Sequence, residues 1–218
     1  MKKLAVFDLD GTLINTIDDL AGSINAILSL KGFETHEVEK YHYLVGHGFS
    51  NLVYRALPED KRDDEKIHSE CLALCKAYYE EHYMDKSKVY DGIKELISSL
   101  KKKGIKTVVL TNKYHKMADA LINKLFDAGT FDLVLGQTDA YPVKPDPTLL
   151  LKVISDFGTE PQNCFMIGDS GMDMAVAVNA KCNGIGVLWG FRDEKELREN
   201  GADYIVSKPC EIEEIIGD

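Results

Sequence analysis

The feature that most constrains the fold is an alternation of short apolar runs with segments of helical periodicity, interrupted once after the first run. That run, Leu4–Phe7, lies in a segment, Lys3–Phe7, that is typical of a buried strand. From about residue 18 to residue 86 strand signals vanish, and helical segments follow one another. The alternation then resumes and continues along the chain. This order predicts an α/β fold, in which right-handed βαβ units form a parallel sheet with helices on both faces.

The same pattern places the individual elements. In the interruption we expect helices at residues 18–30, 37–44, 49–57 and 64–83. After it we expect strands at 105–110, 133–135, 164–167, 185–188 and 204–206, and helices at 92–103, 115–126, 148–157, 172–180 and 194–200, with a short helix at the end. In the helix 64–83, one face with a spacing of three or four residues is predicted to be buried: Ile67, Cys71, Leu74, Cys75 and Tyr78.

The helical interruption predicts a second, smaller domain. We expect residues 16–86 to form an α-helical cap domain, inserted into a core made of residues 1–15 and 87–218. Because the insert leaves and re-enters the core beside the end of the first strand, we expect it to cover that end like a lid.

The net charge of −10 limits the partners, because nucleic acids and anionic membranes are bound by basic faces; we expect neither. The first apolar run stops at Asp8, too early for a signal peptide, and no stretch is long enough to span a membrane, so a cytoplasmic protein is expected. The five cysteines include no CxxC pair, which favours buried thiols over zinc sites or disulfides. An anionic substrate would need cations supplied by its own binding site.

Polar residues gather where a parallel sheet binds ligands, at the carboxyl ends of its strands. Four segments of the chain contribute them: Asp8, Asp10, Gly11 and Thr12 after the first strand; Thr111 and Asn112 after the strand 105–110; Lys144 before a helix; and Gly168, Asp169, Ser170 and Asp173 after the strand 164–167. We therefore predict a site at this rim of the sheet.

The residue types favour phosphoryl transfer. Clustered carboxylates cannot all stay ionised without a cation, and oxygen ligands without His or Cys favour Mg²⁺ over Zn²⁺. Lys144 adds a positive charge, and Thr111 with nearby backbone N–H groups can hold phosphate oxygens. One carboxylate is then free to attack phosphorus, while a neighbour acts as acid and base.

Each of these sequence features also has a purely structural explanation that involves no active site. Asp8–Thr12 is a plain turn sequence, and Thr111-Asn112 could cap a helix. Lys144 could be a solvated loop residue, and a helix dipole favours acids such as Asp169 and Asp173. The joint occurrence of these features, in order and each at a strand end, favours the site.

These residues resemble the motifs of the haloacid dehalogenase superfamily, in the branch with a helical cap inserted after the first strand. The DxDGT motif is matched by Asp8–Thr12, the hydroxyl of the second motif by Thr111, the lysine of the third by Lys144, and the acidic pair of the fourth by Asp169 and Asp173. The resemblance spans the chain. It implies a Rossmann-like core, an aspartyl-phosphate intermediate, and one Mg²⁺ bound by Asp8, Asp169 and the backbone carbonyl of Asp10.

The resemblance also implies roles for the side chains. Asp8 is expected to be the nucleophile and Asp10 the general acid and base, with Thr111 and Lys144 holding the transferring phosphoryl group. We expect Gly11, Thr12 and Asn112 to contact the substrate. Asp173 is expected at the metal site, either as a ligand or as a neighbour of one.

Within the superfamily the sequence is most similar to the phosphoglycolate phosphatases, in the segments Thr111–Lys113, Gly46–Leu57, Trp189-Gly190 and Gly201–Asp203. This implies hydrolysis of 2-phosphoglycolate. In the cap, we predict that His47 donates a hydrogen bond to the leaving group and that Arg55 pairs with its carboxylate. The alternative is that Gly46 and Gly48 only separate two helices and that Arg55 is solvated.

Other activities share parts of this set. A dehalogenase needs neither a metal nor Asp10, whereas a β-phosphoglucomutase-like sugar phosphomutase would share every core residue. A pyrophosphatase is a further related activity. A response-regulator-like signalling domain also combines Asp, Thr, Lys and Mg²⁺ but has no helical insert. A non-catalytic binding module would not need the complete set. The expected partner is a small phosphorylated metabolite, and the expected oligomeric state is a monomer or a homodimer.

Overall fold

The structure, a computed structural model, describes residues 2–217. The chain divides into two compact units. Unit 1 consists of Met1–Ile14 and Val89–Asp218, and unit 2 consists of Asn15–Lys88.

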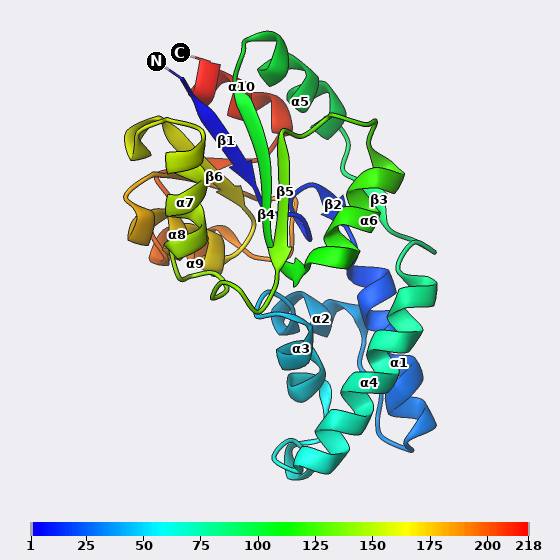
Figure 1. Cartoon of the computed structure of the whole chain (residues 1–218). Coiled ribbons are helices and arrows are strands. Elements are labelled where there is room, and N and C mark those ends of the chain that lie inside the picture. The colour runs from blue at the N-terminus through cyan, green and yellow to red at the C-terminus, as the bar shows by residue number, and fades with distance from the viewer. Residues whose placement is uncertain (1, 218) are drawn as a thin grey trace. The chain divides into compact units, whose positions relative to one another are not determined.

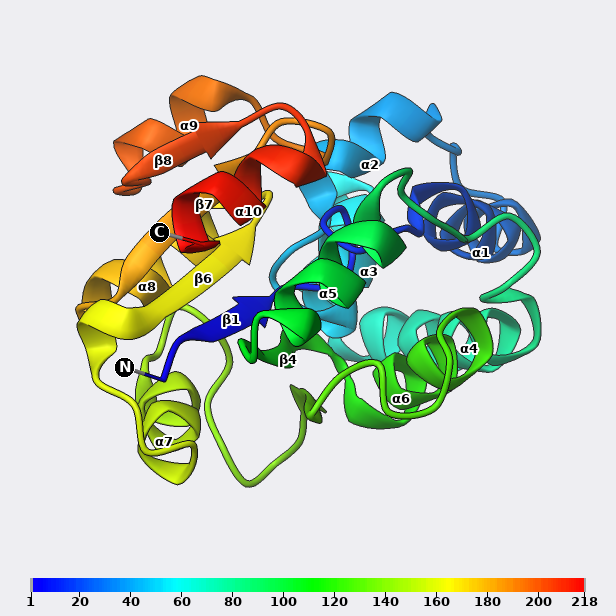
Figure 2. The ribbon, with the colours of Figure 1, turned by 90° about the horizontal axis from the view of Figure 1, so that it is seen from above.

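Unit 1 is built on a parallel sheet. Among the described residues this sheet has six strands in the order β5-β4-β1-β6-β7-β8. Figure 1 labels β5, β4, β1 and β6, and Figure 2 shows β6, β7 and β8. The strands are β1 (Leu4–Phe7), β4 (Lys106–Tyr114), β5 (Leu133–Gln137), β6 (Cys164–Gly168), β7 (Asn183–Val187) and β8 (Tyr204–Val206). The central strand is β1, where Leu4 lies opposite both Lys106 of β4 and Cys164 of β6.

The composition of β1 explains its central place. All four of its residues are apolar and fully buried, as a strand covered on both faces requires. From β1 the chain builds β4 and β5 on one side, and then returns to build β6, β7 and β8 on the other. The direction of strand addition therefore reverses at β1. The carboxyl end of β1 is thus the topological switch point, where open α/β sheets bind ligands.

Helices cover both faces of the sheet. On one face α7 (Thr148–Asp156) and α8 (Gly171–Ala180) pack with β1, β4 and β6 in one apolar cluster. On the other face α5 (Ile93–Lys102) and α10 (Pro209–Gly217) lie against each other (Figure 2). Near the two edges, α6 (His115–Leu125) contacts β4 and β5, and α9 (Glu194–Glu199) contacts β7. A short 3₁₀ turn, η2 (Pro161–Asn163), precedes β6.

Unit 2 is helical. It contains α1 (Ile17–Leu30), α2 (Val38–Leu44), α3 (Phe49–Ala56) and α4 (Glu65–His82), with a 3₁₀ turn, η1, at Glu59–Lys61. Helix α1 packs against α2 and α4, and α3 packs against the same two helices. The buried carboxylate of Asp19 accepts hydrogen bonds from the backbone N–H groups of Lys86 and Ser87, so the first helix is joined to the last segment of the unit. The short strands β2 (Ile14–Asn15) and β3 (Lys88–Val89) pair with each other.

The predicted α/β fold with a parallel sheet is confirmed, with three corrections. Strand β4 does not end at Leu110 but continues to Tyr114, with a shift of register against β5. Of the predicted buried face of α4, Cys71 and Cys75 are buried, Ile67 and Leu74 are half-buried, and Tyr78 is exposed; Tyr79 is buried in its place. The two-residue strands β2 and β3 are too short to leave a sequence pattern. Within residues 2–217, no helix is both long enough and apolar enough to cross a membrane.

Candidate active site

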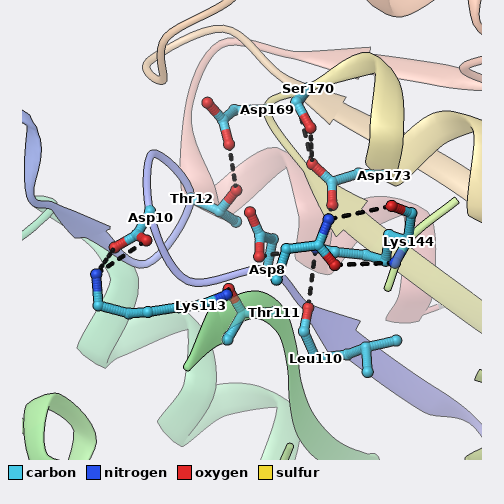
Figure 3. Close-up of polar contacts among 11 residues, drawn as sticks. Asp8, Asp10, Thr12, Leu110, Thr111, Lys113, Lys144, Asp169, Ser170 and Asp173 are labelled. Atoms are coloured by element: carbon cyan, nitrogen blue, oxygen red, sulfur yellow. Dashed lines mark hydrogen bonds and ion pairs between the residues drawn. The ribbon is translucent and has the colours of Figure 1, made fainter. Parts of the chain in front are cut away.

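Asp8 occupies the switch point because it follows β1 directly. Its backbone N–H donates to the carbonyl of Ile167 at 2.9 Å, so the pairing of β1 with β6 continues up to this residue. The Asp8 Oδ1 atom lies 2.8 Å from Nζ of Lys144 (Figure 3). A carboxylate held by the central strand of a sheet has little freedom to move, which suits a group that must approach a substrate in one direction.

The turn after Asp8 depends on Gly11. The carbonyl of Leu9 accepts the backbone N–H groups of Thr12, Leu13 and Ile14, at 3.3, 3.0 and 3.0 Å, and this closes the turn. Gly11 has a φ of +85°, and a Cβ atom there would lie 2.2 Å from Oδ2 of Asp169. Both the backbone conformation and the close approach therefore require glycine. The structure shows Gly11 packed against Asp169, and its predicted contact with the substrate stays a prediction.

Asp169 is fixed by two hydrogen bonds from distant parts of the chain. The hydroxyl of Thr12 donates to Oδ1 at 3.1 Å, and the backbone N–H of Phe191 donates to Oδ2 at 2.8 Å. Burial, together with the nearby charges of Asp173 and Asp8, raises the pKa of Asp169 to about 8. Thr12 therefore orients an acid of the site, and its predicted contact with the substrate stays a prediction.

Lys144 is buried at the centre of the acids. Its Nζ lies 2.8 Å from Asp8 Oδ1 and 2.6 Å from Asp173 Oδ1, and it donates to the carbonyl of Leu110 at 3.0 Å. Burial alone would lower its pKa, but the two carboxylates outweigh burial and raise the pKa of Lys144. With 5% of the residue exposed, the alternative of a solvated loop lysine is wrong.

Asn112 holds the backbone of Lys144. Its side-chain Nδ2 donates to the Lys144 carbonyl at 3.1 Å, and its Oδ1 accepts the Lys144 N–H at 2.9 Å. This pair of bonds fixes a loop residue against β4. The predicted role of Asn112 in binding substrate remains a prediction, because both side-chain ends contact protein in this structure.

Asp173 has both carboxylate oxygens engaged. Oδ1 contacts Lys144, whereas Oδ2 accepts the backbone N–H of Ser170 at 3.1 Å and its hydroxyl at 2.6 Å. The bond from the Ser170 backbone N–H is one half of a capping box at the start of α8, and in the other half the Ser170 side chain accepts the Asp173 backbone N–H. The structure thus ties Asp173 to the lysine and to the helix.

The three buried acids fit a hard divalent cation. Asp8, Asp169 and Asp173 each offer a carboxylate oxygen, and these oxygens lie within 4.8 Å of one another. Burial is the largest cause that raises the pKa of Asp8, to about 6, although Lys144 opposes it. One lysine does not neutralise three carboxylates, and Asp8 Oδ1 is a buried oxygen that accepts no well-aligned hydrogen bond. Oxygen donors of this kind suit Mg²⁺.

A second buried lysine, absent from the predicted site, lies on the same strand as Thr111. Lys113 Nζ contacts both carboxylate oxygens of Asp10 at 3.1 Å (Figure 3). Thr111 is buried two residues earlier, and its hydroxyl accepts the Lys113 N–H at 3.2 Å. In the sequence, Lys113 was noted only as the end of the segment Thr111–Lys113 that resembles phosphoglycolate phosphatases. Its spacing of two residues from Thr111 is a second signal, because alternate residues of a strand face the same side.

Comparison with known proteins agrees with this geometry. A family model described as haloacid dehalogenase-like hydrolase matches residues 5–187. The chain belongs to this hydrolase family. It is 32% identical to the phosphoglycolate phosphatase of Chromobacterium violaceum over 216 residues, which cover 98% of this chain and 96% of that protein.

Solved structures agree as well. A crystal structure from Lactobacillus delbrueckii subsp. bulgaricus matches the hydrolase with a TM-score of 0.90 and 30% identity over 99% of both chains. A predicted phosphoglycolate phosphatase from Haemophilus somnus matches with a TM-score of 0.91 and 27% identity, over 98% of this chain and 97% of that one. The resemblance to the superfamily, and within it to phosphoglycolate phosphatases, is confirmed.

The other predicted site residues of the hydrolase, His47 and Arg55, belong to unit 2. His47 lies between α2 and α3, flanked by Gly46 and Gly48 with φ angles of 108° and 83°. Arg55 is in α3, and its Nη1 donates to the carbonyl of Leu44 at 3.3 Å. These contacts hold the turn together, and the predicted contacts with a leaving group stay predictions.

Proposed function

We propose that this hydrolase is a Mg²⁺-dependent phosphatase of small phosphomonoesters, with 2-phosphoglycolate as its substrate. The observation that carries the proposal is the position of Asp8. Its carboxylate stands at the switch point of the sheet, beside a buried lysine and within a cluster of acids that needs a cation. This combination suits a nucleophile for phosphorus.

We propose that Asp8, Asp169 and the backbone carbonyl of Asp10 would hold Mg²⁺. Bound there, the ion would neutralise the crowded carboxylates and the charge on the phosphoryl oxygens. Asp173 would act differently, because its oxygens already contact Lys144 and Ser170. It would keep the lysine in place beside Asp8.

The proposed reaction has two halves. A carboxylate oxygen of Asp8 attacks phosphorus, and the bond from phosphorus to the leaving oxygen breaks as Asp10 donates a proton to that oxygen. Asp10 then takes a proton from water, whose oxygen attacks phosphorus and breaks the bond to Asp8. Lys144 and Thr111 stabilise the charge on the transferring oxygens throughout. Both aspartates return to their starting states.

The proposed substrate rests on similarity to proteins of that activity, including the phosphoglycolate phosphatase of C. violaceum. We further propose that residues 16–86 are the cap of the enzyme and that His47 and Arg55 contribute to its choice of substrate. The helical composition of unit 2 and its separate core support a distinct role for this part of the chain.

The test is a substrate panel with released phosphate as the readout, run with Mg²⁺, with Ca²⁺ and with EDTA. We expect phosphate from 2-phosphoglycolate with Mg²⁺, little with Ca²⁺, because its larger and looser shell disturbs the geometry, and none with EDTA. Glucose 1-phosphate and pyrophosphate should be poorer substrates. Conversion of glucose 1-phosphate to the 6-phosphate, or a preference for pyrophosphate, would contradict the substrate, and full activity in EDTA would contradict the metal.

A further inference from the structure

Lys113 places a buried ammonium group beside the proposed general acid. Its side chain is 6% exposed, and it extends from β4 to Asp10 on the turn after β1. A buried ammonium needs an anionic neighbour, because desolvation would otherwise be too costly. In the structure Asp10 supplies that charge.

The contact between Lys113 and Asp10 is longer than those of the other buried lysine. Lys113 Nζ lies 3.1 Å from both oxygens of Asp10, whereas Lys144 Nζ lies 2.8 and 2.6 Å from its two partner carboxylates. Charge-assisted bonds between ammonium and carboxylate groups are usually about 2.7–2.9 Å long. Lys113 therefore contacts both oxygens of one carboxylate, and an exchange of that carboxylate for one on a substrate would keep the ammonium paired.

The two lysines lie at different parts of the proposed reaction. Lys144 contacts the nucleophile Asp8, so it lies where the phosphoryl group would be transferred. Lys113 contacts Asp10, which must come within about 2.6–3.2 Å of the leaving oxygen to protonate it. The ammonium of Lys113 is thus one carboxylate group away from the leaving oxygen. In phosphoglycolate, the substrate's own carboxylate is separated from that oxygen by a single methylene group.

We propose that Lys113 binds the carboxylate of the leaving group, so that the core itself selects carboxylated phosphomonoesters. The inference rests on the proposed function, since it takes Asp10 as the acid and a phosphorylated hydroxy acid as the substrate. When the substrate binds, its carboxylate pairs with the Lys113 ammonium, either in place of Asp10 or together with it. Lys113 is then a specificity residue that touches the substrate, in addition to any contribution from unit 2.

The competing explanation is that Lys113 only positions Asp10. The two explanations differ in which substrates depend on the lysine. A positioning residue affects every alkyl phosphate whose leaving oxygen needs a proton, with or without a carboxylate. A carboxylate-binding residue affects only the substrates that carry that charge.

The experiment compares 2-phosphoglycolate, its neutral amide 2-phosphoglycolamide, and p-nitrophenyl phosphate, whose good leaving group needs little protonation. We expect wild-type kcat/KM to favour the acid over the amide by at least about tenfold. In Lys113→Met we expect kcat/KM for the acid to fall by roughly 10- to 150-fold, the range for one hydrogen bond to a charged group. Because Lys113 also contacts Asp10, the amide should lose some activity, but the loss on the acid should be at least about tenfold larger. The aryl phosphate, which needs little protonation, should change least. Lys113→Arg should keep most of the preference.

Lys106 provides the matched control on the same strand. It is exposed at the opposite end of β4, where it pairs with Asp132, so Lys106→Met should leave all three rates unchanged. Equal losses on acid and amide in Lys113→Met, with the aryl phosphate spared, would overturn the proposal in favour of a positioning role. A uniform loss on all three substrates would overturn it too.

Wild-type enzyme alone also tests the proposal, should Lys113→Met fail to fold. Similar wild-type rates on acid and amide would overturn carboxylate recognition and leave the phosphatase intact. Absence of phosphate release from every ester would instead refute the proposed function, and the inference with it.

Discussion

The two units of the hydrolase present their candidate residues in different ways. In unit 1 the candidates come from four distant segments, and hydrogen bonds such as that from Phe191 to Asp169 fix them at the end of a central strand. In unit 2, His47 and Arg55 belong to one turn and the helix after it. In unit 1 the ends of several strands bring the polar residues together, and the sequence reveals this because each of these residues follows an apolar run. In unit 2 a glycine-containing turn between two helices has the same sequence whether it binds a substrate or only joins the helices.

Replacement of the nucleophile should have the largest effect. We expect Asp8→Asn to lower kcat by roughly 10⁴- to 10⁶-fold, the scale for loss of a nucleophile in other enzymes, because an amide does not attack phosphorus. Thermal unfolding in EDTA should show a variant at least as stable as wild type, since one buried like charge is removed. Substantial turnover by the purified variant would show that another group attacks phosphorus.

Loss of Lys144 should impair both catalysis and stability. Lys144→Ala removes a preorganised charge, so kcat should fall by roughly 10²- to 10³-fold. It also leaves Asp8 and Asp173 buried without their cation, which should cost about 3–5 kcal/mol in the free energy of unfolding without metal. Denaturant unfolding in EDTA measures the second effect, and exposed Lys152, which pairs with Asp156, provides a control for lysine removal. A change of only a few-fold in rate would exclude Lys144 from the reaction.

The acid cluster predicts how stability depends on pH. In the folded state the pKa of Asp169 is about 8 and that of Asp8 about 6, both above the ordinary value of 3.8. The fold therefore holds protons that the unfolded chain releases, so metal-free stability should fall as pH rises from about 4 to 8. Each kcal/mol lost should lower Tm by about 2–4 °C for a chain of this size.

Mg²⁺ should reverse this trend, because its ligands must be deprotonated. We expect the rise in Tm on adding Mg²⁺ to be larger at pH 8 than at pH 5, and Asp169→Asn to flatten the metal-free profile. Thermal scans of both proteins at the two pH values, with Mg²⁺ or EDTA, measure this. An equal metal-induced shift at both pH values would count against the acid cluster as the metal site.

The sequence predicted the parts of the site that follow apolar runs. Asp8 and Asp169 stand directly after β1 and β6, and Lys144 belongs to a motif, so their residue types and order revealed them. Lys113 was noted only as the end of a family-like segment and was given no role, because the apolar run ends at Leu110 while the strand continues to Tyr114. Nothing local indicated that Thr12 would bond Asp169, which is 157 residues away, or that a backbone N–H at Phe191 would do the same. Hydrogen-bond partners set by tertiary structure leave no trace in a single sequence.

The smallest expected effect concerns unit 2 and would sharpen the contrast between the units most. If Arg55 reads the substrate carboxylate, Arg55→Ala should lower kcat/KM for 2-phosphoglycolate by roughly tenfold more than for p-nitrophenyl phosphate. His47→Ala should give a smaller loss of the same kind, since a neutral donor contributes less than a charged one.

Because Arg55 also donates to the backbone carbonyl of Leu44, part of any loss of activity in Arg55→Ala will be structural. Arg62→Ala isolates that part, because Arg62 likewise donates to backbone carbonyls, those of Leu57 and Arg55. Equal losses on both substrates in Arg55→Ala and Arg62→Ala would give the turn a structural role. Unit 1 alone would then select substrates with a carboxylate, and Lys113→Met should abolish that selectivity.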